Sequence, residues 1–189
     1  MPRWFLGACF GALACTGSLS ATTTVALTFD EIVSRADMVF VGEVIDVRPF
    51  RLRTRDGSVI KTRVVFRVTE PLTRGVGIVE VLEFLGGELD GVGMAVADMP
   101  RFTIGDRRVV FARRERSINP IVGFTQGLLR VAADASRVDR VWTLDGSPVA
   151  GITSIGGLQA GPAVPAGTPM SLAELRAQIL RALPATRRR

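Results

Sequence analysis

Histidine is absent from this chain, and its two cysteines, Cys9 and Cys15, both lie within the first fifteen residues. Without an imidazole, the chain lacks the usual general base for a serine or cysteine nucleophile and the commonest metal ligand. No disulfide can form within the rest of the chain, so the fold must depend on a hydrophobic core. A chain of this size can build one, because about 150 residues bury roughly 68–70% of their unfolded surface.

Few other side chains suggest catalysis. The single lysine, Lys61, has no Ser-x-x-Lys context. Glu80 and Glu83 are three residues apart on one predicted strand, so they point to opposite faces. Glu88 and Asp90 could contribute to a calcium site, but such a site needs about six or more oxygen ligands. We therefore predict that the chain is not an enzyme and has no catalytic residue, no metal site and no cofactor.

Residues 1–21 are typical of a secretory signal peptide. Arg3 precedes an uncharged run over residues 4–14, which is shorter than the stretch of about 20 apolar residues that spans a bilayer. One possible cleavage site leaves Ala21 first, and another leaves Cys15 first. The second site resembles a bacterial lipobox, whose cysteine is acylated. We expect an exported protein, periplasmic or extracellular, and the second site would tether it to a membrane as a lipoprotein.

Arginine dominates the charge of the chain, which carries 24 basic residues against 18 acidic ones and a net charge of +6. A basic balance favours an anionic partner such as envelope lipid or glycan, although a solvated surface is the simpler interpretation. Nucleic acid is not expected, because the chain is exported and has no tyrosine for base stacking. The basic residues gather around the turn between two predicted strands and again further along the chain: Arg48, Arg51, Arg53, Arg55, Lys61 and Arg63, then Arg113, Arg114 and Arg116.

Local patterns predict a mainly β domain that opens with a short helix. A capping box at Thr28 and Glu31 marks the start of that helix. β-Branched residues and period-two alternation then predict antiparallel strands, and Gly42 predicts a bend within the first of them. Short strands at this spacing indicate a small barrel or sandwich. The predicted strands are residues 37–47, 60–72, 78–85, 94–97, 107–112, 121–124 and 127–131.

The character of the chain changes after residue 131. Glycine and proline become frequent over residues 156–169, which predicts a linker. A second capping box, Ser171 and Glu174, begins an amphipathic C-terminal helix. We therefore divide the chain into a signal peptide (1–21), a β-barrel (27–131), a hairpin extension with a Gly/Pro linker (132–170), a helix (171–183) and a basic tail (184–189).

Four segments of the barrel region follow one another in a recognisable order. They are residues 36–44, residues 60–72 leading into a Thr-Arg-Gly turn, residues 78–84 and residues 107–111. In this order the chain resembles the netrin-like module, the fold of the amino-terminal domain of the tissue inhibitors of metalloproteinases. It is also similar to exported bacterial proteins of unassigned function. The resemblance covers residues 29–131 and implies an OB-like antiparallel barrel flanked by a helix.

The resemblance does not carry the inhibitory mechanism with it. Those inhibitors place an amino-terminal cysteine on the zinc of the protease, whereas the barrel segment here has no cysteine. The resemblance does imply a partner contact in the connector after the third strand. The alternative is a flexible turn whose glycines supply positive φ. The residues concerned lie within segment 86–93 and are Gly86, Gly87, Glu88, Leu89, Asp90 and Val92.

Taken together, these patterns predict an exported, non-catalytic module that binds another exported protein, as a modulator or accessory of a secreted protease. The alternative is a basic, envelope-associated module that binds anionic lipid or glycan. The two differ in their response to salt, because ions screen exposed charges but leave an apolar interface intact.

Overall fold

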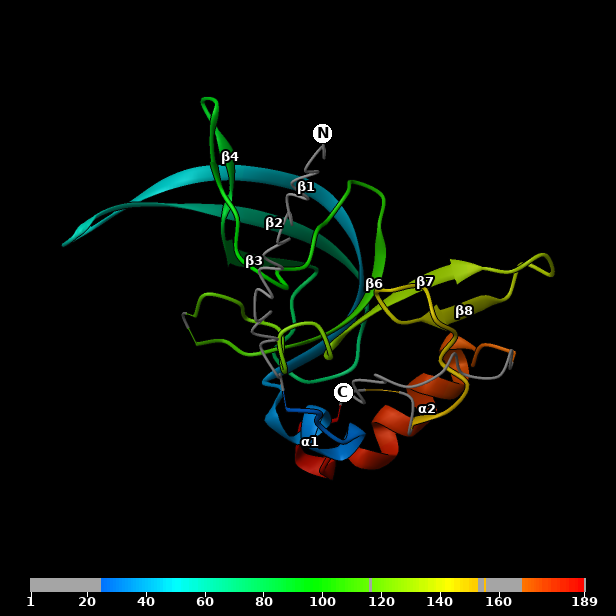
Figure 1. The fold of residues 1–189 in the computed structure, drawn as a ribbon. Helices are drawn as coiled ribbons and strands as arrows, with labels where there is room; N and C mark the ends of the chain where they lie inside the picture. Colours follow the sequence, from blue (N-terminus) through cyan, green and yellow to red (C-terminus); the bar gives the residue numbers. More distant parts are fainter. Residues whose placement is uncertain (1–24, 116, 153–154, 156–167, 189) are drawn as a thin grey trace, which may run out of the picture.

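The computed structural model describes residues 25–115, 117–152, 155 and 168–188 (Figure 1). The described chain is mainly β, with two α-helices. Its elements are α1 Phe29–Arg35, β1 Met38–Thr54, β2 Gly57–Pro71, β3 Val79–Leu85, β4 Gly87–Leu89, β5 Val92–Met94, β6 Arg107–Ala112, β7 Leu128–Ala133, β8 Asp139–Trp142, α2 Leu172–Ala182 and the 3-10 turn η2 Ala185–Arg187.

Six strands form one antiparallel sheet in the order β3-β2-β1-β6-β7-β8, and β4 and β5 form a separate two-stranded hairpin. The prediction of a mainly β, antiparallel fold with a helix at each end is confirmed. The six-stranded sheet is not closed, because β3 and β8 lie at its two edges. The expected OB-like barrel is therefore not confirmed.

The long strand β1 bends where the sequence predicts it. The β1–β2 register shifts between Val41 and Gly42 and again between Val44 and Asp46. A Cβ atom on Gly42 would lie 3.0 Å from the Phe40 ring and 3.2 Å from the carbonyl oxygen of Arg67. Glycine is needed here because the backbone of β2 and the Phe40 ring come so close. The bend curves β1 and β2 over the rest of the molecule (Figure 1).

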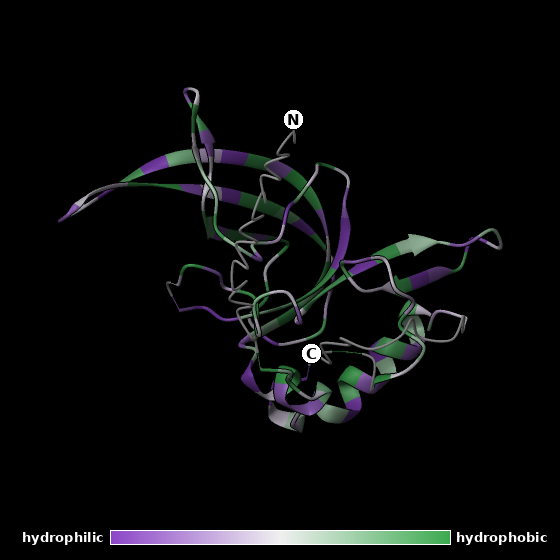
Figure 2. Cartoon of the chain, viewed as in Figure 1, coloured by the Kyte–Doolittle hydropathy of each residue, from purple (hydrophilic) through white to green (hydrophobic). Residues whose placement is uncertain are grey.

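Both faces of the sheet are buried around its centre. Val39 and Val41 of β1 pack with α1 and α2 on one face, and Met38 and Phe40 pack on the opposite, concave face. Residues 38–42 are consequently all buried, since successive side chains on a strand point to opposite faces. Further along β1 and β2, hydrophobic and hydrophilic residues alternate (Figure 2). The concave core contains Phe40, Phe66, Phe84 and Phe102, whose rings meet pairwise at centroid distances of 4.8–5.7 Å.

The two helices begin at the predicted capping boxes. Thr28 accepts a hydrogen bond from the Glu31 backbone N–H, and the Glu31 side chain accepts one from the Thr28 backbone N–H. Ser171 and Glu174 form the same arrangement at the start of α2. The two helices lie next to each other below the sheet (Figure 1). Neither helix is of a length and apolarity that would let it cross a bilayer, and the described residues contain no other candidate.

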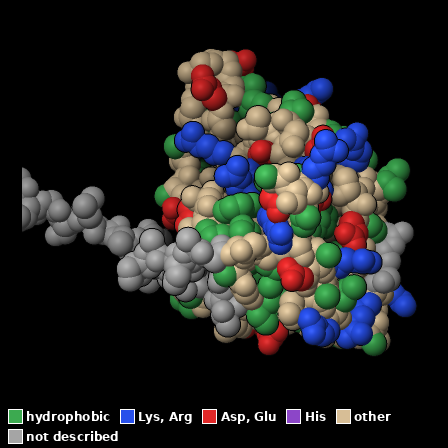
Figure 3. Space-filling view, turned by 90° about the vertical axis from the view of Figure 1, so that its right-hand side faces the viewer, with side chains coloured by type: hydrophobic (Ala, Val, Ile, Leu, Met, Phe, Trp, Pro, Cys, Tyr) green, Lys and Arg blue, Asp and Glu red, His purple; other side chains and the backbone are tan. Residues whose placement is uncertain are grey.

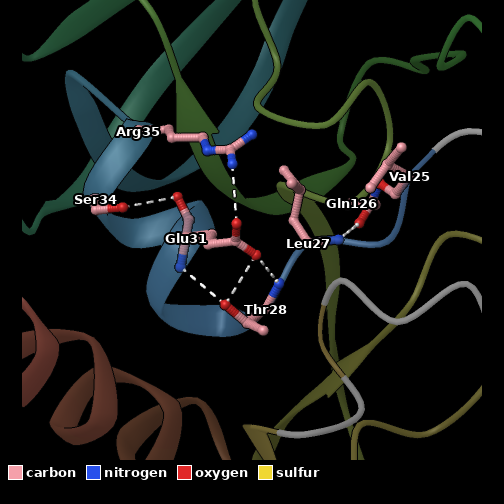
Figure 4. A network of polar contacts seen from close by, with 7 residues as sticks. All are labelled: Val25, Leu27, Thr28, Glu31, Ser34, Arg35 and Gln126. Atoms are coloured by element: carbon pink, nitrogen blue, oxygen red, sulfur yellow. Dashed lines mark hydrogen bonds and ion pairs between the residues drawn. The ribbon is translucent and has the colours of Figure 1, made fainter.

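A side-chain amide fixes the chain as it enters α1. Gln126 Oε1 accepts a hydrogen bond of 2.7 Å from the Leu27 backbone N–H, and Gln126 Nε2 donates one of 3.0 Å to the Val25 carbonyl (Figure 4). The primary amide thus satisfies two backbone groups as a neighbouring strand would. This contact joins residues about a hundred positions apart in the sequence and orients α1 against the sheet.

Two of the predicted short strands differ from the structure. Residues 121–124 do not form a strand: Ile121 makes one bridge to Ala112, and Gly123 and Phe124 have φ of 63° and 64°, so the chain turns back. The short strand expected at 94–97 is found earlier, as β5. In the segment predicted as a basic tail, Arg188 bridges to Thr73. The leader, Cys15 and most of the Gly/Pro linker lie outside the described residues.

Candidate functional site

The predicted contact segment is a β-hairpin rather than a glycine-rich loop. β4 and β5 pair with Leu89 opposite Val92, and the turn between them is Asp90-Gly91. Asp90 has φ of 54° and Gly91 has φ of 75°. Two successive residues with positive φ are the signature of the turn that suits a two-residue hairpin, and Asp-Gly is a preferred pair for it. The Asp90-Gly91 pair is visible in the sequence, but the neighbouring glycines favoured the prediction of a glycine-rich connector.

The base of the hairpin is fixed to β1 and β2 by close backbone contacts. Thr62 Oγ1 donates a hydrogen bond of 2.7 Å to the Gly86 carbonyl, and the Gly86 N–H donates one of 2.8 Å to the Ile60 carbonyl. A Cβ atom on Gly87 would lie 2.5 Å from Thr62 Oγ1 and 3.5 Å from Pro49. The two glycines therefore supply both positive φ and room for this approach.

The tip of the hairpin, by contrast, points into solvent (Figure 1). Val92 is 53% exposed, and the Asp90 side chain is 79% exposed. Leu89 is half-buried beside Val92, and Glu88 is exposed. The nearest cation to Asp90 is Arg51 at 4.0 Å. The six predicted contact residues thus divide into a fixed base, Gly86 and Gly87, and an exposed tip in which an apolar pair is flanked by carboxylates.

A cleft of 620 Å³ lies at the base of this hairpin. Residues 95–102 form its other side, and we call it the hairpin cleft. The sequence did not predict it, although apolar residues in the loop before β6 were a signal. Its apolar lining comes from Val47, Phe84, Met94, Val96, Met99 and Phe102.

The first group of basic residues lies on the β1–β2 hairpin, as predicted, and most of its members have a carboxylate partner. Glu83 of β3 lies 3.1 Å from Arg63 and 3.8 Å from Lys61. Arg53 and Arg55, near the turn, have no carboxylate within ion-pair distance among the described residues. The remaining pairs are Arg48 with Asp46 at 3.0 Å and Arg51 with Asp90 at 4.0 Å.

A second cleft, of 640 Å³, brings parts of both basic groups together. It lies between β3 and the segment 113–120, where a closed barrel would have its seam, and we call it the seam cleft. The Arg63 guanidinium lies 5.1 Å from the centre of the Phe50 ring, which also lines the cleft. Other lining residues include Lys61, Arg63, Val81, Arg113, Arg114 and Pro120.

Several acidic residues near the two clefts and in the sheet make structural contacts. Glu80 accepts a hydrogen bond of 2.7 Å from the Gly77 N–H, while Glu83 pairs with cations on the other face of β3. Arg107 donates two hydrogen bonds, of 2.6 and 2.7 Å, to Asp139. These bonds hold the pKa of Asp139 below its ordinary value and raise the pKa of Arg107. In the part of the chain that the structure describes, no three acidic or cysteine side chains cluster as metal ligands would.

Positive charge is not gathered into one patch on the face that Figure 3 shows. On the face drawn in Figure 3, Lys and Arg side chains alternate with acidic and apolar ones. The described residues thus include the hairpin cleft, the seam cleft and the projecting β1–β2 and β4–β5 hairpins.

No protein-family model, curated protein or solved structure matches this chain. The resemblance to the netrin-like module therefore stays a prediction. The functional proposal rests on the geometry of the chain itself.

Proposed function

We propose that this chain is an exported, non-catalytic module that binds another exported protein through the β4–β5 hairpin. The observation that carries the proposal is the contrast between the fixed base of this hairpin and its exposed apolar tip. A contact that is already ordered before binding loses less conformational entropy when the complex forms. Leu89 and Val92 would enter the partner, and the adjacent hairpin cleft would receive an apolar side chain from it.

We further propose that the partner is a secreted protease or a protein associated with one, so that the chain acts as a modulator or accessory. The curved sheet with its helix layer supports an OB-like, netrin-type plan whose seam is open. Export through the signal peptide, and acylation if Cys15 becomes the first residue, belong to the same proposal. Acylation would hold the hairpin near a membrane without changing its contacts.

Affinity capture from the native exoproteome tests this proposal. We expect the wild-type chain to retain one or a few proteins at high salt, because an apolar contact resists ionic screening. The double variant Leu89→Asp and Val92→Asp should lose them. Val138→Asp, an exposed apolar residue in the β7–β8 turn, is the matched control and should retain them. Retention of the same proteins by the double variant would reject the hairpin as the contact.

A second function, binding of anionic envelope lipid or glycan, is favoured by Arg53 and Arg55. These two side chains are exposed on the projecting hairpin and have no carboxylate partner among the described residues. Basic side chains near an anionic membrane each contribute about 1 kcal/mol to binding. Sedimentation with vesicles of anionic and of neutral phospholipid tests it: binding should need the anionic lipid, decrease steeply with salt and be lost in the variant Arg53→Glu and Arg55→Glu.

A further inference from the structure

We infer that the outward edge of β3 is a docking site for an extended segment of a partner protein, which joins the sheet in the seam cleft as an added strand. This site does not involve the β4–β5 hairpin. The proposal therefore stands or fails independently of the function proposed above.

The hydrogen-bond pattern shows which backbone groups of β3 face outward. The Val68 N–H donates to the Ile78 carbonyl, and the Gly86 N–H donates to the Ile60 carbonyl. Because an antiparallel strand alternates between inward and outward pairs, the even-numbered residues 78–86 direct their backbone groups toward β2. Residues 79, 81, 83 and 85 direct theirs away from it, toward the seam cleft.

One of these outward groups already shows the pairing that a strand would make. The Leu85 N–H donates a hydrogen bond of 2.8 Å to the Ile118 carbonyl, across the seam. For Val79, Val81 and Glu83, no backbone partner on that side is found within the described residues. The segment 113–120 thus meets β3 at one end, and the cleft of 640 Å³ lies beside the rest of the edge.

The opposite edge of the same sheet, β8, is covered by another part of the chain. β8 is covered by the chain before α2, because the Val141 N–H donates to the Met170 carbonyl and Arg140 bridges to Ser171. Natural proteins protect an edge by such a cover, by proline, by charged side chains, especially lysine, or by a bulge. β3 contains neither proline nor lysine, and no bulge interrupts its pairing with β2. Its two charged side chains already have partners, because Glu80 accepts from the Gly77 N–H and Glu83 pairs with Arg63. An uncovered, regular edge is what strand addition requires.

The surroundings of the edge define the chemistry of the segment that would bind. Val79 and Val81 are 46% and 48% exposed on the outer face, so the added strand should place apolar side chains beside them. The opposite wall carries Arg113 and Arg114. Arg113 pairs with Glu115, whereas the Arg114 side chain donates to the neutral carbonyl of Gly75. An acidic side chain on the other face of the added strand would pair with Arg114, so an alternating apolar and acidic sequence fits best.

A displayed peptide library tests this inference on the full chain. The probe is a set of random segments of seven residues, the length of β3. We expect enriched peptides to alternate apolar and acidic residues and to lack internal proline. Val81→Pro removes one outward N–H but none of those directed toward β2, and proline is tolerated at such edge positions. Affinity for Val81→Pro should decrease about tenfold, and Val81→Ile, which keeps both the N–H and an apolar side chain, should bind as the wild type does.

Two further measurements keep the result interpretable. With the strongest peptide bound, amide hydrogen exchange at Val79, Val81 and Glu83 should slow about tenfold, and exchange in the β4–β5 hairpin should not change. Arg114→Glu should reverse the preference from acidic to basic peptides. If Val81→Pro does not fold, as judged by circular dichroism, the exchange pattern and Arg114→Glu decide.

Three outcomes would overturn the inference. The first is the absence of any enriched peptide, and the second is equal affinity of the selected peptides for Val81→Pro and the wild type. The third is a dimer of this chain that Val81→Pro abolishes, because a second copy would then occupy the edge in place of a partner protein.

Discussion

Residues 38–42 of β1 are all buried, whereas residues 51–54 of the same strand are all exposed. The first stretch lies between the helix layer and the aromatic concave core. The second belongs to a two-stranded hairpin that extends beyond both β3 and β6 (Figure 1). Pairing with β2 continues through both stretches and ends only at Thr54 opposite Gly57.

Pairing with β2 extends along almost the whole of β1, but only part of the strand is packed into the domain. Pairing with β2 is common to both stretches, whereas pairing with β6 and the burial of side chains on both faces are confined to the first. We therefore expect the two stretches to differ in stability. Regions with few buried apolar contacts open at low free energy, and binding surfaces are commonly drawn from them. We therefore expect residues 38–42, the proximal stretch, to determine the stability of the fold. Residues 51–54, the distal stretch, should be available for partners.

The largest expected difference is between two phenylalanines of β1. Phe40 is fully buried against Phe66, so Phe40→Ala should lower the free energy of unfolding by about 3–5 kcal/mol. Phe50 is half-buried beneath the Arg63 guanidinium, so Phe50→Ala should cost about 1 kcal/mol or less. Chemical denaturation measures both. Equal losses would show that the distal hairpin is part of the cooperative core.

Two glycines provide a smaller contrast. Gly42→Ala would place a methyl group against the Phe40 ring and the Arg67 carbonyl, and overpacking of this kind costs about 1–3 kcal/mol. At Gly93, on the projecting β4–β5 hairpin, an added Cβ meets no atom within 4 Å. Gly93→Ala should therefore change stability by about 0.5 kcal/mol or less. A thermal shift of similar size in both variants would argue against a special role for the bend in β1.

Removal of the helix cap of α1, which lies beneath the proximal stretch, should have an intermediate to small effect on the free energy of unfolding. Thr28→Ala removes the acceptor for the Glu31 N–H and should cost about 1 kcal/mol. Ser34, later in α1, donates only to the Glu31 carbonyl at the surface, so Ser34→Ala is the control and should remain within about 0.5 kcal/mol. If the two variants unfold at the same denaturant concentration, the capping box is not stabilising this helix.

The smallest effect we expect depends on pH. Arg107 lies opposite Glu43 of β1 and holds the pKa of Asp139 below its ordinary value of 3.8 through two hydrogen bonds. A carboxylate whose pKa is lowered by folding stabilises the protein above the unfolded pKa, and this contribution is lost as acid protonates the folded form. Asp139→Asn should therefore make stability less dependent on pH between about pH 5 and pH 2.

The partner of this carboxylate supplies the control for the pH prediction. Arg107→Gln removes the same two hydrogen bonds from the other side and should produce the same loss of acid dependence. An unchanged decrease of stability with acid in both variants would show that the pair contributes nothing measurable.

Local signals in the sequence predicted the local structure well. Both helices begin at their capping boxes, because Thr28 with Glu31 and Ser171 with Glu174 act within one turn of the chain. Alternation predicted β2, and Gly42 predicted the bend in β1. The prediction ended β1 at residue 47, seven residues too early, because the distal stretch is rich in arginine, contains Pro49 and is held by pairing with β2.

The candidate site was predicted only in part. The six contact residues lie within seven consecutive positions, so their grouping required no tertiary information. Their hairpin and its fixed base nevertheless depend on Thr62 and Ile60 of β2. The seam cleft unites Lys61 with Arg114, residues more than fifty positions apart, and no spacing in the sequence indicates this. The predicted strand at 121–124 failed because an apolar run does not reveal whether it pairs or turns.

The sequence by itself determined the helix starts, the alternating faces of the strands, the bend at Gly42 and the lack of histidine chemistry, since each depends on residue type or on neighbours within a few positions. Only the tertiary structure decided that the sheet stays open, that β8 is covered while β3 is not, and which arginines face carboxylates. These features depend on how far two long strands curve before they meet distant segments. The bend at Gly42 is local, but where the curved strands meet those segments depends on the packing of both cores.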